Sequence, residues 1–219
     1  MAYTVKPAGC LNCPLFESGK HFVPDEIPPN ATIIIRGEAP GRVECERSRP
    51  FQGQAGFVLK EWLLKAVPQL QVALEQGKVG FSNNLKCWPP ELNGRPYPTG
   101  ETKRGAEEQC KQYTNWPKTV HTVILCGEHP MRHFFGPELE EEDAASRMIG
   151  REPKGVMGRI GRVIERDGIR WVFAPHPAYI LRQPSLVQHG QECLKIAANN
   201  FETVEPNIMP WAIALQEIS

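Results

Sequence analysis

The chain has 219 residues, a length that suits one compact domain with a substantial core. Hydrophobic residues make up 41% and charged residues 23%, ordinary values for a globular protein, and no apolar run is long enough to span a bilayer. The first residues do not form a secretory signal, so we expect a cytoplasmic protein rather than a membrane or secreted one. The formal net charge of +0 argues weakly against non-specific coating of nucleic acid.

Short apolar runs alternate with helical patterns along the chain. β-branched runs that end at glycine or proline predict buried strands, and apolar residues at every third or fourth position predict helices. Proline-rich or charged stretches between them predict loops. We expect strands at 31–36, 79–85, 119–127 and 169–174. We expect a helix carrying Val58 to Val67 that stops near Pro68, a helix from Glu101 to Trp116, a helical turn through 133–135 and a last helix from about Leu186 to Phe201. Between these elements we expect a loop at 88–105 and an exposed surface insertion or mobile loop at 137–159.

Strands that alternate with helices predict one α/β domain over residues 1–219, with a mainly parallel sheet. In such sheets the binding site lies at the carboxyl ends of the strands. Three polar or glycine-rich segments follow predicted strands, at Gly37–Gly41, Asn83–Cys87 and His176–Arg182. We therefore expect these segments to meet at one edge of the sheet and to form the functional site.

Charge is unevenly distributed in the second half of the chain. Acidic residues crowd positions 138–143, whereas basic residues recur from Arg147 to Arg170. Two solvated surfaces would explain this pattern, and the basic stretch could equally border a phosphate-binding face. The sequence does not choose between these interpretations.

Seven cysteines are many for a chain without a secretory signal, and in a reducing compartment they indicate metal binding rather than disulfides. Cys10 and Cys13 form a C-x-x-C pair. Cys87 and Cys110 would complete a set of four thiolates, which suits tetrahedral zinc or an iron–sulfur cluster, unless these two are ordinary buried thiols. No partner at ligand spacing is found for the remaining three, Cys45, Cys126 and Cys193.

The segments Gly37–Gly41 and Arg49–Gly56 are both rich in glycine. They lack the lysine of a P-loop and the spacing of a dinucleotide-binding turn. Glycines at the end of a strand allow a ligand to approach the backbone closely. Phe51 lies between Pro50 and Gly53 and is suited to stack on a flat ring, although a lone aromatic residue is more often part of a core.

Taken together, these motifs resemble those of family IV uracil-DNA glycosylases, the iron–sulfur type. Gly37–Gly41 (GEAPG) with Arg49–Gly56 (RPFQGQAG) resembles the family's first motif. Ser82–Pro90 (SNNLKCWPP) is similar to its Asn-x-x-Lys-Cys-Arg-Pro-Pro segment, and His176–Arg182 (HPAYILR) to its His-Pro-x-x-x-Leu-Arg motif. The four cysteines match the family's cluster ligands in order.

The resemblance covers roughly residues 10–200 and implies both a fold and an activity. The fold would be a three-layer α/β/α sandwich with a mainly parallel central sheet. The activity would be hydrolysis of the N-glycosidic bond of a uracil flipped out of DNA, the first step of base excision repair. We expect a monomer that binds uracil-containing DNA at the nucleoid and does not bind a membrane. A replication or repair protein would be a further partner. The implied cofactor is one [4Fe–4S] cluster, held by Cys10, Cys13, Cys87 and Cys110.

For the base pocket, the resemblance implies that Phe51 stacks on the flipped uracil. The side-chain amide of Asn83 would read the Watson–Crick edge, which cytosine cannot mimic because an amino group replaces its O4. Gly37 would border this pocket, and backbone N–H groups around Glu38 and Ala39 would bind uracil O2 as negative charge builds up. Donors aimed at developing charge contribute on the order of 3 kcal/mol each. For Asn83 the plain alternative is a turn asparagine.

For the chemical step, the resemblance implies that His176 donates to uracil O2 or lies beside it. Family I enzymes place a water-activating aspartate where this chain has Ala39, so Glu38 and Glu44 are the candidates for the general base. Pro40 and Arg182 would contact the DNA, which must be held open because flipping a base costs a few kcal/mol. The plain alternative for His176 is a histidine that merely caps the end of a strand.

Two other functions stay open at this point. One is a catalytically weak or inactive accessory protein of the same fold that binds DNA or uracil. Trp88 in place of the family's arginine, the long segment between Cys87 and Cys110, and the neutral net charge favour it. The other is a nucleotide-binding domain stabilised by zinc, since thiolate spacing alone does not identify the metal.

Overall fold

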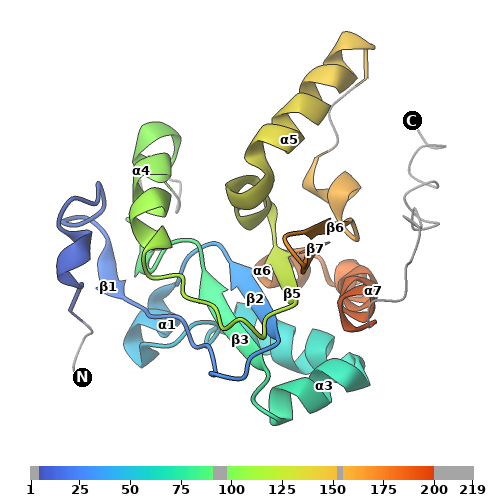
Figure 1. The fold of residues 1–219 in the computed structure, drawn as a ribbon, viewed down its shortest axis with the longest axis horizontal. Helices are drawn as coiled ribbons and strands as arrows, with labels where there is room; N and C mark the ends of the chain where they lie inside the picture. The colour runs from blue at the N-terminus through green and yellow to red at the C-terminus, as the bar shows by residue number, and fades with distance from the viewer. Residues whose placement is uncertain (1–4, 91–97, 152–154, 200–219) are drawn as a thin grey trace.

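The computed structural model describes residues 5–90, 98–151 and 155–199, and Figure 1 shows its fold. Strands alternate with helices over most of this length, as the sequence predicts. In chain order the elements are η1 (Ala8–Cys10), β1 (Lys20–Phe22), β2 (Ile33–Gly37), α1 (Arg42–Arg47), α2 (Gln54–Phe57), the π-helical η2 (Val58–Leu63), η3 (Leu64–Ala66), α3 (Pro68–Glu75), β3 (Val79–Asn83), β4 (Cys87–Trp88), α4 (Gly100–Lys111), β5 (Thr122–Cys126), α5 (Glu128–Met148), η4 (Val156–Arg159), β6 (Val163–Arg166), β7 (Ile169–Ala174), α6 (Pro177–Arg182), η5 (Pro184–Leu186) and α7 (Val187–Ala198).

The central sheet has 5 strands in the order β3-β2-β5-β7-β6. All neighbouring strands are parallel except β6 and β7, which pair antiparallel. Helices cover both faces of this sheet (Figure 1), so the predicted three-layer α/β/α sandwich with a mainly parallel sheet is confirmed. Every residue of β2, β3 and β5 is buried, which explains why their sequences are mainly apolar and do not alternate between apolar and polar residues.

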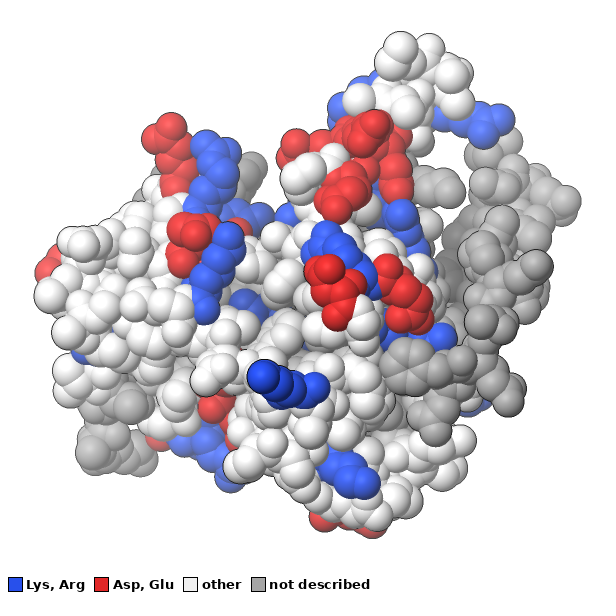
Figure 2. Space-filling view, viewed as in Figure 1, with Lys and Arg blue, Asp and Glu red and all other residues white. Residues whose placement is uncertain are grey.

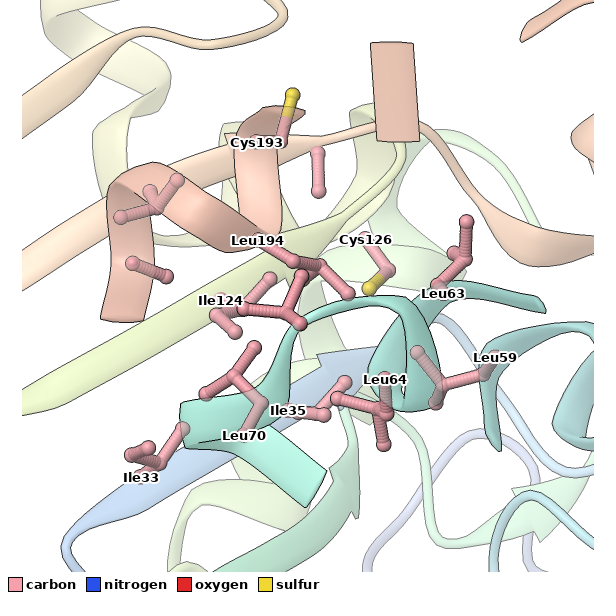
Figure 3. Packing of buried hydrophobic residues seen from close by; sticks show 14 of the residues in the cluster. Ile33, Ile35, Leu59, Leu63, Leu64, Leu70, Ile124, Cys126, Cys193 and Leu194 are labelled. Carbon is pink, nitrogen blue, oxygen red and sulfur yellow. The ribbon is translucent and has the colours of Figure 1, made fainter. Parts of the chain in front are cut away.

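The two faces of the sheet pack separate hydrophobic clusters. Successive residues of a strand point to opposite faces, so Ile33 and Ile35 join one cluster and Ile34 the other. The first cluster packs against the helical segment 54–66, α3 and α7 (Figure 3). The second packs against α5 through Met131 and Phe135. The sheet is thus held rigidly between its helices, which fixes the positions of its strand ends.

The helix expected around Val58 begins earlier, at Gln54, and runs as a continuous helical segment to Ala66. It stops before Pro68 as predicted. A further helix, α3, then begins at Pro68 itself, and the sequence reading missed it. Proline is favoured at the first position of a helix because it has no N–H to leave unpaired there, so Pro68 marks a start as well as a stop.

Of the two structures expected at 137–159, an exposed insertion or a mobile loop, the loop is wrong for residues 137–148, because they continue α5 as a helix, and most of these residues are exposed. The helix is kinked at Phe135, whose φ of −130° is non-helical, and Pro137 lies two residues further on. Proline removes a helical hydrogen bond and clashes with the preceding turn, which accounts for the kink. Leu139 and Asp143 are buried, so this part of the helix packs against the rest of the domain.

The acidic and basic stretches pair with each other across α5. Arg162 Nη1 lies 2.5 Å from Glu142 Oε1, Arg166 Nη1 lies 3.1 Å from Glu138 Oε1, and the buried Arg159 forms an ion pair with Asp143. Figure 2 shows acidic and basic side chains gathered together over α5. These three arginines are therefore neutralised within the fold and do not form a separate phosphate-binding face.

Strand β6 is the one strand of the central sheet that the sequence reading did not predict. It pairs with β7 across a two-residue turn in which Asp167 and Gly168 have φ values of 56° and 74°. An Asp-Gly pair between two strands is a strong hairpin signal because both residues tolerate positive φ. That signal was present in the sequence.

The N-terminal region forms a second, smaller sheet in which β1 pairs antiparallel with β4. Helix α4 is shorter than predicted, since it ends at Lys111 and not at Trp116.

No helix among residues 5–90, 98–151 and 155–199 is both long and apolar enough to cross a membrane.

Candidate active site

The three segments expected at the carboxyl edge of the sheet do meet there. Strand β2 ends at Gly37 and β3 at Asn83, and these two residues are register partners. The backbone N–H of Asn84 donates to Gly37 O at 3.0 Å, which ties the two strand ends together. His176 follows the end of β7 by two residues. The fourth parallel strand, β5, adds its own end at Gly127, which the sequence reading had not singled out.

Gly37 is the point where the predicted base-binding side chains converge. A Cβ atom at this position would lie 2.5 Å from Asn83 Oδ1 and 2.9 Å from Phe51 Cζ. Any side chain larger than hydrogen would therefore displace the amide or the ring. Phe51 and Asn83 are each only 6% exposed. The ring and the amide thus border the same small space at the end of β2.

Phe51 has an unusual backbone conformation, with a φ of 53°. Positive φ is uncommon for a residue with a bulky side chain and persists only where the surroundings enforce it. The Phe51 ring also packs 5.7 Å from the Phe81 ring, centroid to centroid, and belongs to the main hydrophobic cluster. The interpretation of Phe51 as a core residue therefore accounts for its burial. It does not account for the strained backbone, which holds the ring beside Gly37.

Glu44 holds this loop together through three backbone N–H groups. Its Oε2 accepts from Gly41 at 3.1 Å, and its Oε1 accepts from Gln52 at 3.0 Å and from Gly53 at 2.7 Å. Both carboxylate oxygens are thus engaged in joining the start of α1 to the loop that carries Phe51. These contacts are those of a positioning group and leave Glu44 poorly placed to activate a water molecule.

Glu38 lies in the loop between β2 and α1, and its environment differs from that of Glu44. Burial raises the pKa of Glu38 to about 7, with the neighbouring Glu107 adding to the rise and Lys103 opposing it. Its Oε1 lies 3.5 Å from His129 Nε2 in the first turn of α5. A carboxylate with a pKa near the working pH suits general base catalysis, so Glu38 is the stronger of the two candidates.

His176 forms the N-cap of α6, and its Nδ1 accepts a hydrogen bond from the backbone N–H of Ala178 at 3.2 Å. Burial, together with smaller contributions from Arg182 and His129, lowers the pKa of His176 to about 4. The imidazole is therefore neutral at pH 7, and with Nδ1 accepting, its single proton is on Nε2. The capping role expected as an alternative is present, and it leaves His176 as a neutral Nε2–H donor.

The end of β5 packs directly against this histidine. Gly127 has a φ of 91°, and a Cβ atom there would lie 3.0 Å from His176 Cβ. On the outer side, Arg182 is exposed on α6, with its guanidinium 5.9 Å from the Tyr179 ring. Pro40 is buried and Ala39 is half-buried in the loop after β2. Of the two predicted DNA contacts, Arg182 is thus the accessible one.

A buried polar network lies beneath the edge. The buried Arg36 donates from Nε to Asn84 Oδ1 at 2.9 Å, and Asn84 Nδ2 donates to Glu107 Oε1 at 3.2 Å. Lys86 donates from Nζ to Asn83 O at 2.7 Å and forms an ion pair with Asp25. Buried charges are tolerated only when they are paired and hydrogen-bonded. This network fixes the end of β3 and hence the position of Asn83.

The four cysteines expected to act together line one cavity, on the other side of the segment that carries Asn83. Its lining also includes Lys6 and Lys86. Burial, with a smaller contribution from the other thiols of the set, raises the pKa of Cys87 to about 12 and that of Cys110 to about 11, as expected for groups that lie close together. Cys126 and Cys193 are instead buried in the main core. The cavity is lined by Cys10, Cys13, Cys87 and Cys110.

Comparison with known proteins identifies the family of the chain. The model of the uracil DNA glycosylase superfamily matches residues 24–202, a range that contains the whole strand-end site. The chain belongs to the uracil DNA glycosylase superfamily.

Curated relatives in this superfamily are similar over most of their length. The Type-4 uracil-DNA glycosylase of Pyrobaculum aerophilum is 30% identical over 183 residues, which cover 81% of this chain and 82% of the relative. That of Archaeoglobus fulgidus is 31% identical over 191 residues, covering 85% of each chain. That of Sulfurisphaera tokodaii is 29% identical over 193 residues, covering 85% of this chain and 77% of the relative.

For a member of the uracil DNA glycosylase superfamily, the main omissions of the sequence reading are Gly127 and His129. Both follow the clearest strand of the sequence, and the rule that sites form at the carboxyl ends of parallel strands would have included them. No residue pattern, however, indicated that His129 contacts Glu38, because the two are far apart in the chain.

Proposed function

We propose that this protein is a uracil-DNA glycosylase that hydrolyses the N-glycosidic bond of a uracil flipped out of DNA, the step that begins base excision repair. The observation that carries the proposal is the convergence of the Phe51 ring, the Asn83 amide and the neutral His176 at one edge of the sheet. Membership of the superfamily and the names of the curated relatives support it.

Base recognition falls to the pocket beside Gly37. The Phe51 ring stacks on the flipped uracil, and the Asn83 side chain pairs with its Watson–Crick edge. Because Lys86 and the buried network hold the end of β3, the Asn83 amide is presented in one orientation. A site built on fixed polar groups rejects a base that leaves those groups unpaired, so cytosine is excluded.

Bond cleavage sends the electron pair of the glycosidic bond onto uracil, where negative charge collects on O2. The Nε2–H of His176 donates to this oxygen, together with backbone N–H groups around Glu38 and Ala39. A neutral donor that is already oriented stabilises the developing charge without reorganisation, which usually makes the largest catalytic contribution. The Ala178 hydrogen bond that fixes the tautomer of His176 is therefore part of the mechanism.

Glu38 acts as the general base for the attacking water. Water adds through its oxygen to C1′ of the sugar as the bond from C1′ to N1 of uracil breaks. The water proton passes to Glu38, and the uracil anion is protonated by solvent. Glu44 keeps the loop in shape and takes no proton. On the DNA side, Arg182 contacts the strand where the base has left, and Pro40 shapes the adjoining loop.

The cysteine cavity holds one [4Fe–4S] cluster, with Cys10, Cys13, Cys87 and Cys110 as ligands. Four thiols lining one cavity suit such a cluster. Among the described residues, no group of three or more His, Cys, Asp or Glu side chains is arranged to hold a metal ion, so the proposal of a cluster rests on the four thiols that line the cavity and on the resemblance of the motifs. When bound, the cluster supplies structure: it ties the N-terminal segment to the strand end that carries Asn83.

The accessory-protein alternative is not favoured. Trp88, one of the features behind it, has a structural place: it belongs to β4, and the Lys20 ammonium lies 4.7 Å from the centre of its ring. We expect the enzyme to act as a monomer on uracil-containing DNA at the nucleoid in the cytoplasm, and to meet a replication or repair protein there.

The proposal is tested with purified, iron-loaded protein and a single-stranded or duplex oligonucleotide that contains one uracil. We expect release of free uracil and an alkali-labile abasic site, with no cleavage of the matched oligonucleotide containing cytosine. Absence of uracil release from intact DNA by protein with a full complement of iron would overturn it.

A further inference from the structure

We propose that His129 is a positioning residue that holds the Glu38 carboxylate against the attacking water. The inference rests on the proposed glycosylase function and deepens it. His129 lies in the first turn of α5, three residues after β5 ends, and none of the sequence motifs includes it.

The geometry ties His129 to the Glu38 loop twice. Its Nε2 lies 3.5 Å from Glu38 Oε1. Its backbone carbonyl accepts a hydrogen bond from Asn84 Nδ2 at 3.2 Å, and the backbone N–H of Asn84 donates in turn to Gly37 O at 3.0 Å. The backbone of Glu38 is fixed as well, because its carbonyl accepts from Leu85 at 3.0 Å. His129 and Glu38 are thus held at a constant separation by the ends of β2, β3 and β5.

His129 suits this role because it is neutral. Burial lowers the pKa of His129, Lys103 and Arg132 lower it further, and Glu128 and Glu107 oppose them. A cationic imidazole beside Glu38 would lower the pKa of the carboxylate and weaken it as a base. A neutral imidazole with its proton on Nε2 donates one hydrogen bond instead, which orients the carboxylate and preserves most of its basicity.

The charged and titratable groups that face this pair come from several elements. Lys103 and Glu107 belong to α4, Glu128 and Arg132 to α5, and His176 caps α6. These groups stay in place in a His129 variant, so a change in the pH profile reports the loss of the His129 donor. In the reaction His129 transfers no proton: the water proton passes to Glu38 and from there to solvent.

Two variants separate positioning from mere structure. His129→Ala removes the donor, whereas His129→Gln keeps an amide N–H that can reach Glu38. The matched control is His121→Gln, which changes a histidine at the opposite, amino end of β5. Single-turnover release of uracil is measured for each protein between about pH 5 and pH 9, together with the Kd for uracil-containing DNA and the thermal midpoint.

We expect the wild-type rate to rise with pH through a midpoint near 7 as Glu38 loses its proton. His129→Ala should lower the rate about 100-fold, the cost of misplacing a reacting group, and move the midpoint to higher pH because the carboxylate has lost a donor. His129→Gln should recover most of the rate, and His121→Gln should behave as the wild type. The Kd for DNA should stay unchanged throughout.

A wild-type rate and midpoint in folded His129→Ala would overturn the inference. So would equal losses in His129→Ala and His129→Gln with an unmoved midpoint, because those losses would report damage to the fold. If His129→Ala does not fold, His129→Gln alone decides, since a slow, folded Gln variant with an unchanged midpoint contradicts the role. Failure of the underlying function is distinct, since the wild type itself would then release no uracil.

Discussion

The two ends of the segment from Asn83 to Cys87 lie in very different surroundings. At Asn83 the chain enters the strand-end site, where polar groups are held rigidly and their pKa values are shifted toward a chemical task. At Cys87 it enters the cysteine cavity, where thiols are packed among apolar neighbours such as Leu15 and Leu85. Under our proposal, the first region changes charge during the reaction and the second binds one permanent group.

Lys86 connects the two regions. Its side chain lines the cysteine cavity, while its Nζ donates to the carbonyl of Asn83. Loss of the group bound in the cavity should therefore lower iron content and stability and also disturb the strand-end site through Lys86. Variants at the strand-end site should affect rate and specificity while the iron content stays at the wild-type level.

The largest effect is expected at His176. Removing the Nε2–H donor with His176→Asn should reduce the single-turnover rate about 100- to 1,000-fold, the loss typical of one donor to a developing oxyanion. Asparagine is a favoured N-cap residue, so α6 should stay capped and the thermal midpoint should stay close to that of the wild type. His176→Ala should lose a similar amount of rate and, in addition, about 1 kcal/mol of stability.

Single-turnover kinetics and thermal unfolding of both His176 variants check this prediction. Wild-type cleavage by His176→Ala, which has no side-chain donor, would show that the donor to uracil O2 is another group. Kd for uracil-containing DNA should be nearly unchanged, because the interaction forms mainly in the transition state.

A smaller effect, on specificity, is expected at Asn83. In Asn83→Asp a carboxylate can accept from the amino group of cytosine but cannot donate to uracil O4. An unpaired buried polar group costs about 1–3 kcal/mol, so the preference for uracil over cytosine should fall roughly 10- to 100-fold. Competing oligonucleotides that differ only in this base measure the ratio. An unchanged ratio of uracil to cytosine cleavage would show that another residue recognises the base.

On the cavity side, Cys110→Ala should abolish most of the iron content and lower the thermal midpoint. Binding of a structural metal group contributes directly to the folding free energy, so its loss appears as instability. Cys126→Ala is the matched control, because Cys126 is equally buried but packs in the main core. Iron and sulfide near four per chain in the wild type, retained in Cys126→Ala and lost in Cys110→Ala, would establish the ligand set. Full iron in Cys110→Ala would refute it.

The strand-end site was largely predictable from the sequence, and the reason is local. Strands β2, β3, β5 and β7 are almost entirely buried and so appear as short, mainly apolar runs, and the residues that follow them must share one edge. The contact between His129 and Glu38 was not predictable, because it depends on how far each loop turns after its strand. Neither loop carries a pattern that reports this.

Helix α5 shows the opposite case. Its second half has few apolar residues, which is why residues 137–148 read as a loop. The helix is instead held by ion pairs with arginines that follow it in the chain, including the buried pair of Arg159 with Asp143. Such pairs join residues that are distant in sequence, and charge periodicity alone does not reveal them. The Arg159–Asp143 pair is therefore the part of this region that is hardest to predict from the sequence.

The smallest effect is expected from Glu44, and it distinguishes the two carboxylates of the loop after β2. Glu44→Gln keeps an oxygen that accepts from the backbone but loses the charge, so the loop should weaken by about 1–2 kcal/mol through its hydrogen bonds to Gly41, Gln52 and Gly53. The rate should fall only a few-fold, because the Phe51 ring is held less firmly. The pH midpoint near 7 should stay in place, since it belongs to Glu38.

Glu38→Gln is the matched variant for this comparison. The pKa of Glu38 is raised, so the wild type loses its ionised base as the pH falls through about 7, and the rate falls with it. In Glu38→Gln this dependence should disappear and the rate should be low at every pH. If the rate no longer depends on pH in Glu44→Gln but keeps its wild-type pH dependence in Glu38→Gln, Glu44 is the general base and Glu38 is not. It would also mean that a carboxylate already bound to three backbone N–H groups can still take a proton from water.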